Sequence, residues 1–207
     1  MTGNKQHRNI RIVRYILYRE TLVDFKEHFW SFIGSFFGIG VIGYIQNSYL
    51  SISDNIFLIG SFGASSVLIY GAIQSPLAQP RNLIGGHLVS AVTGVTISYL
   101  LPHSVLVAAP LAVSLSIVLM QITKTLHPPG GATALIAVIG SESVKSLGFW
   151  YVLYPVFSGA LILLLVALVV NNMTSKRQYP TSKRHTRLIK SNLPLSKLLK
   201  KRTQKSV

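Results

Sequence analysis

The chain has 207 residues, of which 49% are hydrophobic and only 12% are charged, and its formal net charge is +15. The charges lie almost entirely near the two ends, because residues 28–170 contain only three Lys or Arg and two acids. This distribution excludes an ordinary water-soluble domain for the middle of the chain, which we expect to lie in a lipid bilayer. The absence of cysteine excludes a disulfide scaffold, thiolate metal sites and cysteine nucleophiles.

The basic N-terminal segment covers residues 1–27. Between residues 10 and 27, apolar and charged side chains recur at roughly helical spacing. This pattern predicts an amphipathic helix lying on the membrane surface. A plain extension of the first membrane span is the alternative interpretation.

Six apolar segments follow, and together they predict an all-α polytopic membrane domain over residues 28–172. They cover about residues 28–47, 56–73, 83–101, 104–122, 127–141 and 148–170. Four are long enough for a span, which needs about 20 residues. The segments 56–73 and 127–141 are short and interrupted by Gly or Pro, so each is either a broken span or a re-entrant helix.

Both termini are basic, so the positive-inside rule places both in the cytoplasm and requires an even number of crossings. Six crossings put Arg81 and Lys124 inside, and put Asp54, Glu142 and Lys145 outside. Four crossings, with both short segments re-entrant, have the same parity. We predict six, in the plasma membrane of a bacterium.

The two short segments resemble each other. FGASSVLIYG (62–71) aligns with GGATALIAVIG (130–140), which pairs Gly63 with Gly131 and Ser65 with Thr133. Three spans in each half predict an inverted three-plus-three repeat. In transporters built this way, interrupted segments in corresponding positions mark the substrate site.

The second short segment opens with His127-Pro128-Pro129, which cannot lie inside an α-helix. Gly130 and Gly131 permit a close backbone approach, and a new helix is expected to begin near Thr133. The unpaired N–H groups of such a helix N-terminus bind anions. Residues 60–66 are expected to repeat this arrangement, with hydroxyl donors from Ser65 and Ser66 beside Gly63.

An interfacial loop is the alternative interpretation of residues 124–131, with Lys124 reaching lipid headgroups and His127 capping the backbone. Arg81 is either an anion ligand or a positive-inside anchor. His87 is costly in lipid, so it either pairs with a hydroxyl group on another helix or lines a pathway.

Nothing in the sequence indicates an enzyme, a cofactor or a metal. It contains no nucleophile elbow, Walker loop, dinucleotide-binding fingerprint, paired carboxylates or metal-ligand spacing. The tail, residues 173–207, is strongly basic and predicted to be disordered in the cytoplasm, with anionic lipid as its partner. No nucleic-acid-reading motif accompanies its charge. Assembly as a homo-oligomer is a further expectation.

LHPPGGATAL (126–135) resembles the signature of the HPP family of integral membrane proteins. Similarity extends to residues 60–95, through Gly63, Ala64, Ser65, Pro76, Ala78, Pro80, Arg81, Asn82, Gly86 and His87. The resemblance implies a small polytopic membrane protein, and family members from cyanobacteria and chloroplasts are implicated in nitrite transport. It also implies that Arg81, His87 and His127 are site residues.

We therefore expect a membrane transporter of a small anion, with nitrite as the first candidate. The expected ligands are Gly63, Ser65, Ser66, Arg81, His87, Lys124, His127, Gly130, Gly131 and Thr133. The alternative is a membrane scaffold that transports nothing and whose basic tail binds lipid or a partner.

Overall fold

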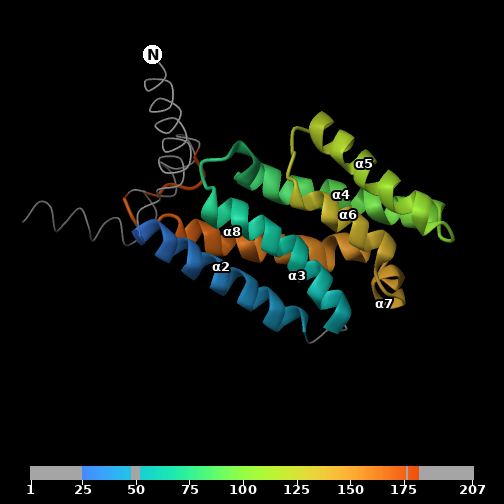
Figure 1. Ribbon diagram of the computed structural model, residues 1–207, viewed down its shortest axis with the longest axis horizontal. Helices are drawn as coiled ribbons and strands as arrows, with labels where there is room; N and C mark the ends of the chain where they lie inside the picture. The colour runs from blue at the N-terminus through green and yellow to red at the C-terminus, as the bar shows by residue number, and fades with distance from the viewer. Residues whose placement is uncertain (1–24, 48–51, 176, 182–207) are drawn as a thin grey trace, which may run out of the picture.

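The computed structural model describes residues 25–47, 52–175 and 177–181, which form helices joined by short connections (Figure 1). The helices are α2 (Phe25–Gln46), α3 (Ile52–Ser66), α4 (Pro80–Leu100), α5 (Val105–Ile122), α6 (Pro129–Ile139), α7 (Glu142–Ser146) and α8 (Ser158–Val170). Two π-helical segments, η1 (Val67–Gly71) and η3 (Val152–Phe157), and one 3-10 turn, η2 (Pro76–Ala78), complete the described chain. The predicted all-α class is confirmed. The predicted surface helix and the tail beyond residue 181 lie outside the described residues, apart from residues 25–27, which begin α2.

Among the described residues, four helical segments are long and apolar enough to cross a bilayer: α2, α4, α5 and Val152–Val170, which is kinked at Tyr154. Large apolar side chains such as Phe32, Phe36 and Leu106 are exposed on α2 and α5, as expected for a surface that meets lipid. The helix α3 passes directly into η1, so residues 52–71 form one longer helical segment. By contrast, α6 has 11 residues and is about 16 Å long, roughly half of the bilayer core.

Successive long segments alternate in direction between the two ends of the bundle (Figure 1). At one end, which we call the Arg177 end, the guanidinium of Arg177 donates to the carbonyl of Glu27 near the start of α2. At the opposite end, Gln46 at the end of α2 donates to the carbonyl of Pro155 in η3. This second end also carries α7 with Lys145, and we call it the Lys145 end. The alternation agrees with six passes through the bilayer, of which α6 spans only part of the thickness.

The packing of the helices agrees with two related halves. In a three-plus-three repeat, α2, α3 and α4 correspond to α5, α6 and α8. The contacts of α2 with α3 and α8 then correspond to the contacts of α5 with α6 and α4, and all four contacts are present. The contact between α4 and α6 is the most extensive in the bundle.

Glycine permits the close contact between α4 and α6. A Cβ atom at Gly130 would lie 2.7 Å from Ser90 Oγ and 3.0 Å from the carbonyl oxygen of Gly86. A Cβ atom at Gly86 would collide with His127, and one at Gly94 would collide with Ala134. These three glycines bring the two backbones together, as small residues do between membrane helices.

The chain beyond α8 returns to the bundle. Arg177 and Tyr179 are both buried, and the Tyr179 hydroxyl group donates to the carbonyl of Ala78 at 2.7 Å. The prediction that a disordered tail begins at residue 173 is therefore wrong for residues 177–181. The folded domain includes them.

Candidate functional site

The chain between α5 and α6 makes a tight turn that presents His127 to the protein interior. The N–H of Thr125 donates to the carbonyl of Met120 at 2.8 Å and the N–H of Lys124 donates to that of Gln121 at 3.1 Å. Lys124 adopts the left-handed conformation (φ 57°) in which glycine usually ends a helix. Residues 125–128 are not helical, so the predicted unwound stretch before α6 is confirmed.

The prediction of unpaired amides at two helix N-termini is wrong. At the start of α6, the N–H of Gly130 donates to the His127 carbonyl at 2.8 Å and that of Gly131 to the Pro128 carbonyl at 3.1 Å, so neither amide is unpaired. Residues 60–66 contain no helix start, because α3 begins at Ile52 and runs through them. The glycines there are tolerated inside the helix and create no break.

Four predicted residues do meet, in a chain of hydrogen bonds that joins three helices. Ser65 Oγ on α3 lies 2.8 Å from His87 Nε2 on α4 and 2.9 Å from His127 Nε2. The other ring nitrogen of His87, Nδ1, lies 2.8 Å from Thr133 Oγ1 on α6. The other ring nitrogen of His127 lies 2.9 Å from the carbonyl oxygen of Leu77.

Ser61 extends this chain by one more hydroxyl group. Its Oγ lies 2.9 Å from Thr133 Oγ1 and 3.0 Å from the carbonyl oxygen of Pro129. Because α-helical residues four apart share a face, Ser61 and Ser65 both point from α3 toward α6 and α4. We call the five side chains the imidazole–hydroxyl cluster: Ser61, Ser65, His87, His127 and Thr133. All five are buried.

The cluster contains hydrogen-bond donors and acceptors but no negative charge. The two carboxylates whose side chains the structure describes are engaged elsewhere: Glu27 lies 3.5 Å from Arg177 and Glu142 lies 3.4 Å from Lys145. On the apolar side, the ring of Phe62 packs against that of His87, with centroids 5.3 Å apart. The cluster is therefore a hydrogen-bonding site in apolar surroundings, with no described carboxylate beside it.

The other predicted ligands lie outside the cluster. Arg81 and Lys124 are exposed at the Arg177 end, where Arg81 donates to the carbonyl of Thr123 at 2.8 Å. The hydroxyl group of Ser66 is buried without a hydrogen-bond partner among the described residues. A Cβ atom at Gly63 would meet nothing within 4 Å, whereas Gly130 and Gly131 face α4 and α5 as packing residues.

Arg177 forms a second buried polar centre, which sequence reasoning missed. Its guanidinium donates to Ser31 Oγ at 3.3 Å, to Asn171 Oδ1 at 3.0 Å and to the carbonyls of Glu27 and Tyr70. Burial lowers the pKa of Arg177, and the neighbouring Glu27 carboxylate acts in the opposite direction. Nothing in the local sequence distinguishes Arg177 from the other basic residues of the tail, because its partners come from distant segments.

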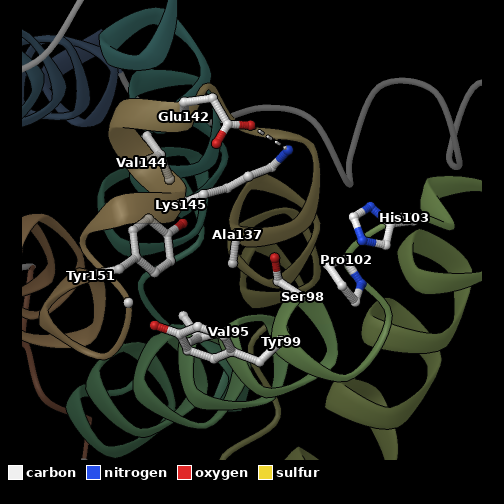
Figure 2. A pocket seen from close by; sticks show the side chains of 11 residues that line it. Val95, Ser98, Tyr99, Pro102, His103, Ala137, Glu142, Val144, Lys145 and Tyr151 are labelled. Atoms are coloured by element: carbon white, nitrogen blue, oxygen red, sulfur yellow. Dashed lines mark hydrogen bonds and ion pairs between the residues drawn. The ribbon is translucent and has the colours of Figure 1, made fainter.

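A pocket of about 310 Å³ opens at the Lys145 end (Figure 2). Ser98 and His103 line it from α4 and the turn after α4, and Lys145 lines it from α7. Tyr151 forms its inner wall, and the Tyr151 hydroxyl group donates to the backbone carbonyl of Thr133 at 3.0 Å. Through Tyr151, the pocket wall therefore contacts the backbone of Thr133, whose side chain belongs to the cluster. The membrane side of Glu142 and Lys145, which both line the pocket, was predicted, but no binding role was predicted for any residue of its lining.

The apolar helical bundle with a buried polar cluster defines this chain as a polytopic membrane protein. The profile described as "HPP, transmembrane region" matches residues 20–180, and the chain belongs to the HPP family. Two transmembrane proteins of Dictyostelium discoideum are 51% and 52% identical to it over 76% and 78% of its length. The chain covers 51% and 58% of those relatives, a little over half of each. No solved structure matches it.

Proposed function

We propose that this protein transports a small inorganic anion across the membrane, and that nitrite is the first anion to test. The observation that carries the proposal is the imidazole–hydroxyl cluster, which is buried between α3, α4 and α6 with no carboxylate beside it among the described residues. Polar side chains are costly at membrane depth and mark substrate pathways there. The resemblance to family members implicated in nitrite transport supports nitrite.

The pocket supplies one side of a route. Lys145, which pairs with Glu142 in the same lining at 3.4 Å, and His103 provide hydrogen-bond donors there for an entering anion. From the pocket, Tyr151 leads to Thr133 and so to the cluster.

The other side of the route leads to the Arg177 end. Asn82 donates to the carbonyl of Leu126 at 2.7 Å, which ties the start of α4 to the turn that carries His127. Arg81, next in the chain, is exposed beside this turn and serves as an attracting charge at this end. The cluster itself is closed in this structure, so transport requires the turn at 125–128 or η1 to move and open it.

Uptake by purified protein in proteoliposomes tests the proposal. We expect nitrite uptake by the natural protein and a loss of more than tenfold in His127→Ala, which removes both contacts of that ring. Thr93→Val is the matched control, since the Thr93 hydroxyl donates only to its own helix at Val89. Failure to transport nitrite, nitrate or formate under any gradient would overturn the proposal.

The scaffold alternative predicts a different pattern in cells. Deletion of the residues after 181 would remove function, and His127→Ala would have no effect. The relatives come from a eukaryote, so a bacterial plasma membrane and cytoplasmic termini stay predictions, as does binding of the tail to anionic lipid.

A further inference from the structure

We propose that the imidazole–hydroxyl cluster binds one proton and passes it between His87 and His127 through Ser65. Where the protein also transports an anion, as proposed above, the proton accompanies that anion. The proton site follows from a count of the hydrogens that the cluster contacts require.

The cluster contains six hydrogen bonds of 3.0 Å or less, and each needs one hydrogen atom. Three hydroxyl groups and two neutral imidazoles supply only five. The Leu77 carbonyl can only accept, so His127 Nδ1 carries a hydrogen and its Nε2 requires the hydrogen of Ser65. If His87 is also neutral, in either tautomer, one of the six contacts has no hydrogen atom and joins two acceptor atoms.

One added proton on His87 removes this conflict. Nε2–H then donates to Ser65, whose hydroxyl group donates to His127, and Nδ1–H donates to Thr133. Thr133 donates to Ser61, and the Ser61 hydroxyl group donates to the carbonyl of Pro129. Each of the six short contacts then joins one donor and one acceptor.

The same six contacts are satisfied when the proton resides on His127. His87 Nε2 releases its hydrogen to Ser65 Oγ as Ser65 releases its own to His127 Nε2, so one O–H bond breaks as another forms. His127 reaches Leu77 in the loop before α4 at the Arg177 end, and Thr133 is joined to Tyr151 in the pocket wall at the Lys145 end. The residues of the cluster thus contact segments at both ends of the bundle through backbone carbonyl groups, and the proton itself moves only between His87 and His127.

The charge of the added proton has no resident partner. The titratable groups in or beside the cluster are His87 and His127 themselves and, next to Thr133, Tyr151. No described carboxylate or other cation from α3, α4, α6 or the 72–79 loop faces it. An isolated buried charge is strongly unfavourable. We therefore expect the proton to bind together with an anion, as a neutral pair.

Nitrogen-15 NMR of histidine-labelled protein tests the proton site independently of transport. We expect an imidazolium signal to appear at neutral pH when nitrite is added, and to disappear in the double variant His87→Gln/His127→Gln, whose amides keep donors and acceptors but cannot be protonated. His28→Gln, which changes an exposed histidine at the start of α2, should leave the signal unchanged. Neutral rings at all nitrite concentrations would overturn the proposal.

Coupled fluxes test the second part. In proteoliposomes with the membrane potential clamped, we expect a lumenal pH dye to report one proton entering with each nitrate or nitrite ion, after subtraction of protein-free vesicles. Ser65→Ala should lower this ratio by interrupting the relay. Anion uptake at the rate of the natural protein but without proton entry would overturn the proton proposal and support anion transport. An imidazolium signal in a protein that transports no anion would overturn the transport proposal and support the proton site.

Discussion

The imidazole–hydroxyl cluster and the Arg177 centre are both buried and polar, yet they are satisfied in different ways. Arg177 carries a permanent charge that four acceptor groups and the Glu27 carboxylate surround. The cluster has no fixed charge and lacks one hydrogen in its neutral state. Arg177 keeps one charge state, and it joins the segment after α8 to the start of α2. Under our proposal, the cluster gains and loses one proton, and Arg177 does not.

The largest expected effect on stability is that of Arg177→Met. This change removes a buried cation and leaves Glu27, Asn171 and the Tyr70 carbonyl without their donor. Breaking a buried charge pair from one side costs about 3–5 kcal/mol, so we expect a clear fall in melting temperature in detergent. Arg81→Met is the control, because Arg81 is exposed and makes one side-chain hydrogen bond. Equal melting temperatures for the two variants would show that Arg177 has no special structural role.

A change in the cluster should affect transport more than stability. His127→Asn keeps a donor near the Leu77 carbonyl but loses the contact with Ser65. Leaving the Ser65 hydroxyl without its acceptor costs about 1–3 kcal/mol, so the protein should still fold. We expect nitrite uptake per folded molecule to fall at least tenfold. In Arg177→Lys, uptake per folded molecule should stay near the natural value. If uptake falls in Arg177→Lys and not in His127→Asn, the assignment of transport to the cluster and of stability to the Arg177 centre is wrong.

The sequence predicted the cluster better than it predicted the Arg177 centre. Ser65, His87, His127 and Thr133 stood out because polar residues are rare inside apolar segments, and the repeat paired Ser65 with Thr133. Their role differed from the expected one, since the amides at the start of α6 donate to carbonyls of the preceding turn. Whether prolines leave amides unpaired depends on the turn that they make, which composition does not determine.

Arg177 could not be predicted, because its environment is created by residues far away in the chain. It lies 150 residues from Glu27 and 107 from Tyr70. In the sequence it is one of many basic residues that follow the last span, where solvated charge is the ordinary expectation. An isolated aromatic residue such as Tyr179 in a basic tail is the available signal, and it marks the segment that packs back.

A smaller effect on stability is expected at Thr133, where the substitution removes only one hydroxyl group from the cluster. Thr133→Val keeps the shape but removes the hydroxyl partner of His87 Nδ1 and the contact with Ser61. We expect a stability loss of about 1 kcal/mol and a strong fall in uptake, while Thr133→Ser keeps most of the natural rate. Thermal unfolding and nitrite flux on the same samples measure both. If valine and serine behave alike, the hydroxyl group has no part in transport.

The smallest perturbation tests how the two ends of the bundle are placed in the membrane. The natural chain has no cysteine, so Arg81→Cys and Lys145→Cys each introduce a single reactive group at an exposed or half-buried position. Arg81 lies at the Arg177 end and Lys145 at the opposite end, so a membrane-impermeant maleimide should label them from opposite sides. Lys124→Cys should follow Arg81→Cys, because both positions adjoin the turn at Thr123. The positive-inside rule predicts that the Arg81 side is cytoplasmic. Labelling of Arg81→Cys and Lys145→Cys from one side would contradict the six-pass arrangement, and with it the assignment of the pocket and the Arg177 centre to opposite membrane faces.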